Sequence, residues 1–142
     1  ARALQLCLDE LPTEPERQRT LRDHLFEGLR RELPDVQLNG PALAPPAARL
    51  PGNLNCHFPW VDGEALMMSM RDVALSSGAA CTSTNPEPSH VLRALGLTTD
   101  WTRSSLRFGL GRFTTLEELD FAIGAVAETV RRLRKLSSLA SG

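Results

Sequence analysis

The sequence predicts an α+β domain in which helices cover a short, mainly antiparallel sheet. Segments with apolar residues at helical spacing alternate with strand-like segments that are few and brief. Each of these strands is apolar on one side only, which is typical of a sheet with one covered face and not of a parallel sheet buried on both faces. A chain of 142 residues with 42% hydrophobic content suits one domain with one core.

Two helices are predicted in the first quarter of the chain. The first ends before Pro12, and its apolar residues are Leu4, Cys7, Leu8 and Leu11. The second is expected over 14–33, where Thr13 and Glu16 form a capping box and Pro34 ends the helix. Its apolar face consists of Leu21, Leu25, Leu29 and Leu33.

The middle of the chain predicts a loop, a strand and a helix. Asn39-Gly40 is a turn signal, and the proline-rich stretch after it indicates a surface loop. Alternation over 53–58 predicts a half-buried strand that Pro59 ends, with Leu54, Cys56 and Phe58 facing inward. Asp62 is expected to cap a helix that carries Leu66, Met67 and Met70. A short buried strand is expected at 73–75.

Residues 76–86 are small, polar and interrupted by glycine and proline, so we expect a mobile loop there. A helix is predicted from Ser89 to a cap at Gly96, with an apolar set of Val91, Leu92 and Leu95. The strand expected over 104–109 places Leu106 and Phe108 on one face and turns Arg107 away from the core.

The last predicted helix begins at a capping box formed by Thr114 and Glu117. Its apolar residues follow at steps of three and four: Leu116, Leu119, Ile123, Val126, Val130 and Leu133. Lys135, the only lysine, lies among arginines near the end of this helix, where we expect it to be exposed.

Composition narrows the class of protein. The formal charge of -1, with acidic and basic residues interspersed, argues against nucleic-acid binding. No apolar stretch approaches the ~20 residues that a membrane span needs, and there is no signal-peptide core, so we expect a cytoplasmic protein without membrane contact. The three cysteines form no close-spaced pair, which predicts reduced thiols.

Cys81 is the candidate nucleophile, because it lies in the small-residue loop where a thiol can be exposed. Cys7 and Cys56 lie on the apolar faces of a helix and a strand, where we expect small buried hydrophobic side chains. Arg107 is the candidate anion binder, since a guanidinium offers a fixed fork of donors to a carboxylate, although an ordinary surface arginine is the plainer interpretation.

No metal site is expected. His24, His57 and His90 are scattered and have no paired spacing to the cysteines. Asp62 and Glu64 are interpreted as helix-start groups and not as an acid/base pair.

Several segments together carry a resemblance to a known family. They are Pro51–Asn55, Asp62–Glu64, Ser76–Ser83, Glu87–Gly96 and Ser104–Thr115. The chain resembles the NifS/IscS-type cysteine desulfurases of the class V aminotransferase family, in order and over nearly its whole length.

The resemblance implies that 1–142 is the small, carboxy-terminal domain of a fold-type I pyridoxal-phosphate-dependent transferase. Residues 1–12 would end the helix that leads from the large domain, which holds the cofactor. The complete enzyme would convert L-cysteine to L-alanine, with Cys81 carrying the sulfur as a persulfide and Arg107 holding the substrate carboxylate. Its implied partners are a second copy of itself and a sulfur acceptor, such as an iron–sulfur scaffold protein.

The start at Ala1 without an initiator methionine is expected of a fragment. We expect this fragment to bind no pyridoxal phosphate and to be inactive alone, because the catalytic lysine would lie upstream. The alternative from a different class is a free-standing persulfide carrier or sulfur-relay module that uses Cys81 without a cofactor.

Overall fold

The computed structural model describes residues 2–44, 49–76 and 89–140. Along these ranges the elements are α1 (Arg2–Glu10), α2 (Glu14–Glu32), β1 (Gln37–Leu38), β2 (Asn53–His57), α3 (Gly63–Ser69), α4 (His90–Ala94), α5 (Thr99–Arg103), β3 (Ser105–Gly109) and α6 (Leu116–Ala140).

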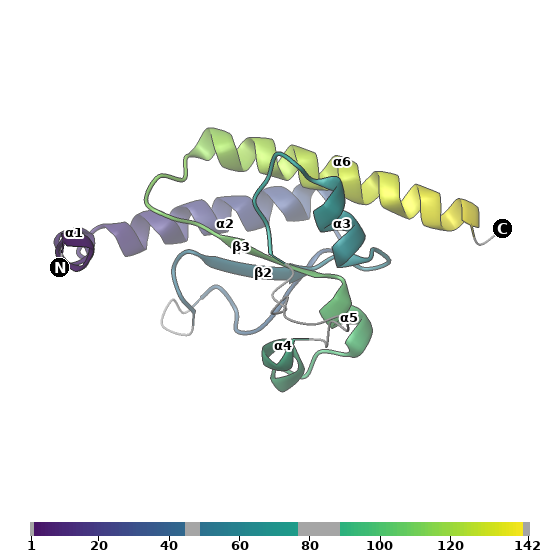
Figure 1. The fold of residues 1–142 in the computed structure, drawn as a ribbon, viewed down its shortest axis with the longest axis horizontal. Coiled ribbons are helices and arrows are strands. Elements are labelled where there is room, and N and C mark those ends of the chain that lie inside the picture. Colours follow the sequence, from purple (N-terminus) through teal and green to yellow (C-terminus); the bar gives the residue numbers. More distant parts are fainter. Residues whose placement is uncertain (1, 45–48, 77–88, 141–142) are drawn as a thin grey trace.

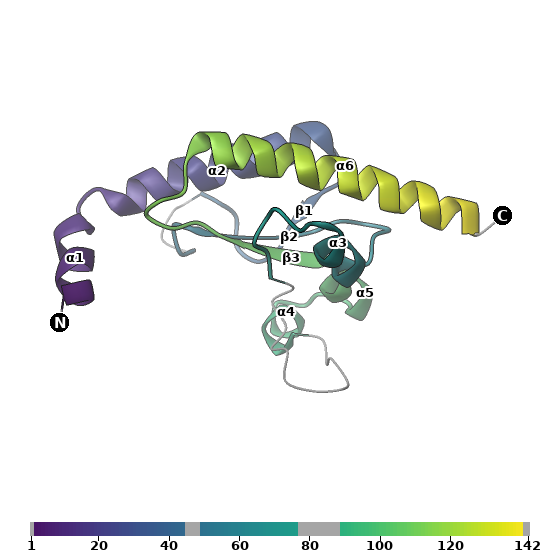
Figure 2. The ribbon, with the colours of Figure 1, turned by 45° about the horizontal axis from the view of Figure 1, so that its top comes forward.

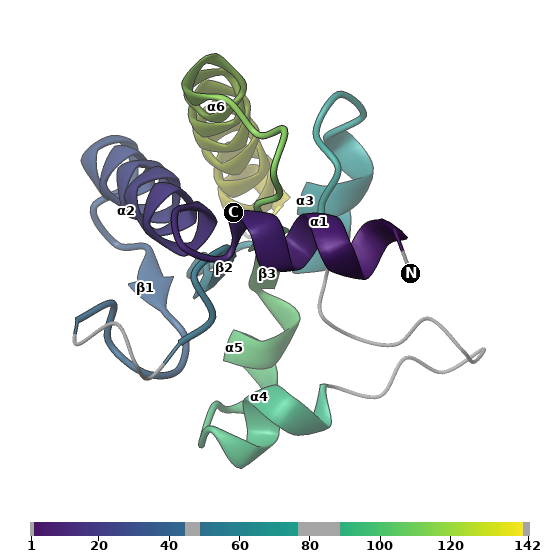
Figure 3. The same cartoon turned by 90° about the vertical axis from the view of Figure 1, so that its left-hand side faces the viewer.

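The strands form one antiparallel sheet in the order β1-β2-β3. Helices α2 and α6 lie side by side over one face of this sheet, and α4 and α5 lie on its other side (Figure 1, Figure 3). Helix α3 packs against α6 and β3. The predicted α+β class, with a short antiparallel sheet covered by helices, is confirmed.

Alternation along the strands gives the sheet one apolar face, which meets α2 and α6. From β2 and β3 this face presents Leu54, Cys56, Leu106 and Phe108, and Phe58 directly after β2 extends it; all five are buried. The helices contribute Leu21, Leu25, Leu29, Leu119, Ile123, Val126 and Val130. Full burial of one such aliphatic side chain stabilises the fold by roughly 1.5–3 kcal/mol. Leu116, included in the predicted apolar face, is instead half exposed.

The two long helices approach closely at Gly28. A Cβ atom at this position would lie 2.2 Å from Cδ1 of Ile123. The missing side chain therefore allows α2 and α6 to pack directly against each other, with Ile123 filling the space.

Two of the three predicted amino-terminal helix caps differ from the structure. Thr13 precedes α2, but its side chain accepts no bond from the first turn of the helix and instead donates to the carbonyl of Glu10 at 3.4 Å. The box predicted at Thr114 lies one residue later: the amide of Thr115 donates to Glu118 Oε2 at 3.0 Å, and the amide of Glu118 to Thr115 Oγ1 at 3.3 Å.

The reason for the shift at α6 is the turn after β3. Thr114 Oγ1 already accepts a hydrogen bond from the amide of Gly111 at 3.0 Å, so this hydroxyl closes the turn and the next threonine caps the helix. The cap predicted at Asp62 is confirmed, since its carboxylate accepts from the amide of Ala65 at 2.8 Å.

The prediction of a strand at 73–75 is wrong. Only Ser76, the next residue, pairs with β3, through an isolated bridge to Arg107. Helix α5 was not predicted, because five residues are too few for a helical period to be visible; its one signal is Thr98, which accepts from the amide of Trp101 at 3.3 Å.

Helix α1 is correctly predicted, but none of its residues is buried. Cys7 is exposed, so the prediction of a small buried side chain there is wrong. The helix projects at one end of the molecule (Figure 2), where the apolar side chains of its predicted face have no layer to pack against within the described residues. An ion pair of 2.6 Å between Glu10 and Arg112 links its end to the β3–α6 loop.

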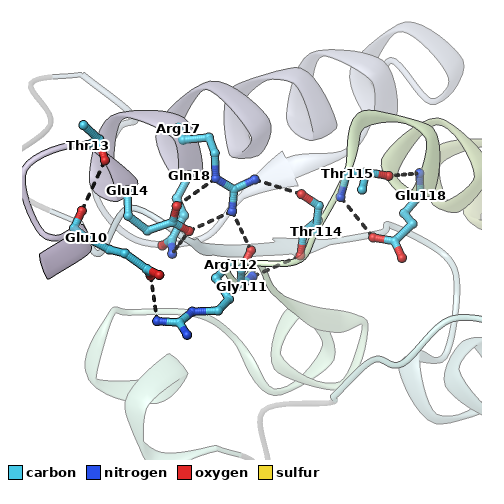
Figure 4. Close-up of polar contacts among 10 residues, drawn as sticks. All are labelled: Glu10, Thr13, Glu14, Arg17, Gln18, Gly111, Arg112, Thr114, Thr115 and Glu118. Atoms are coloured by element: carbon cyan, nitrogen blue, oxygen red, sulfur yellow. Dashed lines mark hydrogen bonds and ion pairs between the residues drawn. The ribbon is translucent and has the colours of Figure 1, made fainter. Parts of the chain in front are cut away.

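Arg17 of α2 ties the same loop to the helix layer (Figure 4). Its Nε and Nη2 atoms pair with the carboxylate of Glu14 at 2.8 and 2.7 Å. Its Nη1 and Nη2 atoms also donate to the carbonyls of Thr114 and Gly111 at 2.9 and 2.8 Å. The bonds from Arg17 lower the pKa of Glu14 to about 2.

Candidate functional site

Arg107 lies in the middle of β3, on the face of the sheet opposite the core. Because side chains alternate along a strand, the burial of Leu106 and Phe108 turns Arg107 outward, where it is exposed. Its cross-strand partner in β2 is Asn55. The Cβ atoms of such a pair lie about 4.5–5.5 Å apart on one face. The predicted orientation of Arg107 is confirmed.

A groove of about 280 Å³ lies beside Arg107. Its polar lining, within the described residues, consists of Asn39, Arg49, Asn53, Asn55, Ser89 and Arg107, with no carboxylate. Val91 of α4 and Leu95 at its carboxy-terminal cap also line the groove, and of the apolar set predicted for this helix only Leu92 is buried. The groove therefore combines an apolar wall with two guanidinium groups and suits an anionic ligand.

Arg49 supplies the second positive charge. Its Nη2 atom donates to the carbonyls of Asn39 and Pro41, both at 2.6 Å, and these bonds hold the turn after β1. Burial and the nearby charge of Arg22 lower the pKa of Arg49. Neither Arg49 nor Arg107 forms an ion pair with an acidic side chain within the described ranges.

Both ends of the segment that contains Cys81 meet this groove. Ser76 pairs with Arg107 through two main-chain hydrogen bonds of 2.7 and 3.3 Å, and its Oγ atom accepts from Arg107 Nη2 at 3.4 Å. Ser89 lines the groove and caps α4 by accepting from the amide of Leu92 at 3.5 Å. Cys81 itself lies outside the described residues, as does most of the loop predicted at 76–86.

A buried polar network lies on the same face of the sheet. The amide of Asn39 contacts three side chains: Asn55 Oδ1 at 2.6 Å, Ser105 Oγ at 2.8 Å and His57 Nδ1 at 2.8 Å. Ser105 Oγ also contacts the carbonyl of Trp101 at 2.6 Å. The network therefore connects β1, β2 and β3 directly beneath the groove.

The ring of His57 stacks on that of Trp101, with the centroids 4.8 Å apart. Burial lowers the pKa of His57, so the ring is neutral at neutral pH. Sequence reasoning missed this network: the alternation of Asn55 and His57 marked them as the outer face of a half-buried strand, and the structure shows His57 to be buried as well.

The remaining candidates have structural roles. Cys56 is fully buried, as predicted, and burial raises the pKa of its thiol to about 12, so it remains protonated. His24 pairs with Asp120 at 2.7 Å on the surface of the helix layer. Among the described residues no group of three histidine, cysteine or acidic side chains could hold a metal ion. None of the helices described here is long and apolar enough to cross a membrane.

The chain is similar in sequence to known proteins, but the similarity covers only part of the length of those proteins. The chain is 50% identical over 138 residues to cysteine desulfurase IscS of Anaeromyxobacter sp. (strain K), covering 97% of this chain and 33% of that protein. It is 48% identical over 137 residues to cysteine desulfurase IscS of Histophilus somni (strain 129Pt), again covering 33% of the relative. The chain thus spans about a third of the length of the curated relatives it matches.

Solved structures share the fold. A NifS-like protein superposes with a TM-score of 0.74 at 23% identity, over 93% of this chain and 32% of that one. A NifS-like protein from Rickettsia africae ESF-5 gives a TM-score of 0.70 at 24% identity, over 87% of this chain and 31% of the other. No protein-family model matches the chain.

Proposed function

We propose that the chain is the carboxy-terminal part of a cysteine desulfurase of the NifS/IscS type, because it matches a third of such enzymes at about 50% identity. The complete protein would convert L-cysteine to L-alanine and pass the sulfur to an acceptor for iron–sulfur cluster or thio-cofactor synthesis. We propose a homodimer for the complete enzyme. A cytoplasmic location suits a reaction that needs a free thiolate.

The observation that supports the assignment most is the position of Ser76 and Ser89, the two described residues that flank segment 77–88, beside Arg107. Cys81 follows Ser76 by five residues, and five residues span at most about 18 Å when fully extended. This chain length allows Cys81 to reach the groove that Arg107 lines. In our proposal, Arg107 binds the carboxylate of L-cysteine and the thiolate of Cys81 approaches its sulfur.

The transfer at Cys81 balances without an external oxidant. The thiolate forms a sulfur–sulfur bond to the substrate thiol while the carbon–sulfur bond of the substrate breaks. The electron pair of that bond stays with the carbon, which takes up a proton, so that L-alanine leaves and a persulfide remains on Cys81. Sulfur is oxidised and carbon is reduced in the same step, and the persulfide can then move to the acceptor protein.

Pyridoxal phosphate, the cofactor implied for the complete enzyme, does not fit the residues of this chain. A Schiff-base lysine needs a desolvated or electropositive pocket. Lys135 is the only lysine, and it is exposed on α6. We therefore assign the cofactor site to the part of the complete protein that this chain does not cover, and we expect the chain alone to be inactive.

Substitutions in the complete protein test both residues. Cys81→Ala is expected to abolish persulfide formation and to leave the absorbance of bound cofactor unchanged, whereas the matched control Cys7→Ala should retain persulfide formation. Arg107→Ala should raise the KM for L-cysteine by about tenfold or more, the effect of losing a charged hydrogen bond. Persulfide recovered from the Cys81→Ala protein, by mass spectrometry after incubation with L-cysteine, would rule out the assignment.

A further inference from the structure

In the polar network beneath the groove, the carbonyl group of Trp101 determines which atom donates and which accepts in each hydrogen bond. The carbonyl oxygen of Trp101 can only accept a hydrogen bond, so the hydroxyl of Ser105, 2.6 Å away, must donate to it. With its single proton used, Ser105 Oγ can only accept from the amide of Asn39 at 2.8 Å. The group of Asn39 that faces Ser105 is therefore its NH₂ group.

This assignment determines the two other contacts of Asn39. Its oxygen faces His57 Nδ1 at 2.8 Å, so that nitrogen must carry a proton. Because a charged imidazolium also carries a proton on Nδ1, the direction of the network is the same for either charge state of His57. The second proton of the Asn39 NH₂ group points to Asn55 at 2.6 Å, so the atom of Asn55 at this contact must be its oxygen.

The NH₂ group of Asn55 is consequently the free end of that amide. No described residue accepts a hydrogen bond from it. Asn55 is the direct cross-strand neighbour of Arg107 and lines the same groove. The groove thus presents two kinds of donor side by side, a guanidinium and a carboxamide NH₂ group, whose direction the buried network holds in place.

We propose that Asn55 is a second carboxylate-binding residue, which donates its NH₂ group to the oxygen of the substrate carboxylate that Arg107 also binds. The proposal rests on the proposed function, in which L-cysteine occupies this groove. It gives the network beneath the groove a function: Asn39 accepts from His57 and donates to Asn55, and so prevents the Asn55 amide from turning its oxygen toward the carboxylate.

Asn55→Asp in the complete holoenzyme is the sharpest variant. An aspartate has the same shape and can still accept from Asn39, so the network and the fold are retained, but the donor beside Arg107 becomes a negatively charged acceptor. The KM for L-cysteine should rise by about tenfold to a hundredfold, in the range expected for losing a charged hydrogen bond, with a smaller change in kcat. Gln37→Glu is the matched control: it makes the same amide-to-carboxylate change at an exposed site on β1, away from the groove, and should leave KM unchanged.

Two inhibitors separate binding of the carboxylate from a general disturbance of the site. L-alanine keeps the carboxylate of the substrate, whereas cysteamine keeps the thiol and amine but lacks the carboxylate. In Asn55→Asp the inhibition constant of L-alanine should rise by the same factor as KM, and that of cysteamine should stay the same. Equal weakening of both inhibitors, or of neither, would overturn the proposal.

A spectroscopic measurement tests the direction of the network independently of activity. ¹⁵N NMR of histidine-labelled complete protein should show neutral His57 protonated on Nδ1, with the signal identified by its loss in His57→Asn; protonation on Nε2 instead would contradict the proposal. Arg107→Ala, measured in parallel, distinguishes a failure of the proposed groove function from a failure of the proposed role of Asn55. If Arg107→Ala leaves L-alanine binding intact, the proposed function of the groove fails; if it weakens binding and Asn55→Asp does not, only the role of Asn55 fails.

Discussion

At the scale of single residues, burial determines which polar groups on the sheet can react. Cys56 and His57 are neighbours on β2 and point to opposite faces, yet both are buried and both are uncharged at neutral pH. Arg107, on the adjacent strand, is exposed. The exposed guanidinium of the sheet is therefore on its outer face, beside Ser76 and Ser89, which flank the segment that contains Cys81.

The buried state of His57 predicts a pH dependence of stability. Burial lowers the folded-state pKa of His57 below the ordinary value of 6.5, so the unfolded chain takes up a proton more readily than the folded one. The free energy of unfolding should be independent of this group above pH 6.5 and should fall as the pH drops from 6.5 toward the lowered pKa. Urea unfolding between pH 5 and 8 measures this slope.

His57→Asn is the matched control for that measurement. Asparagine keeps a donor toward Asn39 but does not titrate. The free energy of unfolding of this variant should therefore depend less on pH below 6.5, although its value differs from that of the unaltered chain at every pH. An unchanged slope in His57→Asn would show that other groups cause the pH dependence.

At the scale of elements, the sequence predicted those parts of the fold whose apolar pattern is long enough to repeat. Helices α2 and α6 and strands β2 and β3 follow their patterns closely. The segment 73–75 was predicted as a strand because its three residues are apolar, but three residues do not distinguish a strand from an extended loop. Side-chain hydrogen bonds to turns changed two predicted caps: Thr114 closes a turn and the cap of α6 moves to Thr115, whereas Thr13 stays in place before α2 but bonds to the carbonyl of Glu10.

The same reasoning explains what could be predicted of the site. The orientation of Arg107 follows from alternation along its own strand, which is a local property. The link between Asn39, Asn55 and Ser105 joins residues 16 and 66 positions apart, so only the pairing of strands in three dimensions brings them together. Local periodicity contains no information about such contacts.

Loss of the Arg17 side chain is expected to weaken the packing of α2 against the β3–α6 loop. Its guanidinium joins α2 to the β3–α6 loop through two carbonyls as well as to Glu14, so Arg17→Met should lower the free energy of unfolding by about 1–2 kcal/mol at pH 7. Since Arg17 lowers the pKa of Glu14 to about 2, the stabilisation by this pair is complete above pH 4.5 and is lost as the pH falls toward 2. The difference between Arg17→Met and the unaltered chain should shrink over that range.

Arg19→Met is the control for this effect. Arg19 forms an ion pair of the same spacing on the same helix, with the exposed Glu16, but has no bond to the loop. Its substitution should change stability by less than about 1 kcal/mol, as for a surface ion pair. Equal losses in the two variants, measured by thermal or urea unfolding, would mean that the bonds to the loop contribute nothing.

At the scale of the whole molecule, the chain has a complete core, but in our proposal it contains only part of a catalytic site. The apolar face of the sheet is fully covered by α2 and α6, whereas its polar face holds a groove with guanidinium groups and no lysine. The chain covers about a third of its relatives, so the proposal requires that the remaining two thirds supply the cofactor site opposite this groove.

This division predicts how the purified 142-residue chain responds to pyridoxal phosphate. Lys135 is exposed on α6 and not in a desolvated pocket, so we expect no saturable Schiff-base absorbance and no release of alanine from L-cysteine. Any weak surface reaction should be trapped by borohydride at Lys135 or at the α-amino group of the purified chain, and only the part at Lys135 should disappear in Lys135→Arg. Saturable binding that survives in Lys135→Arg would show a cofactor site of another kind within this chain. Sulfur transfer to Cys81 from a persulfide donor, in a protein whose gene encodes no further domain, would instead favour the cofactor-free carrier.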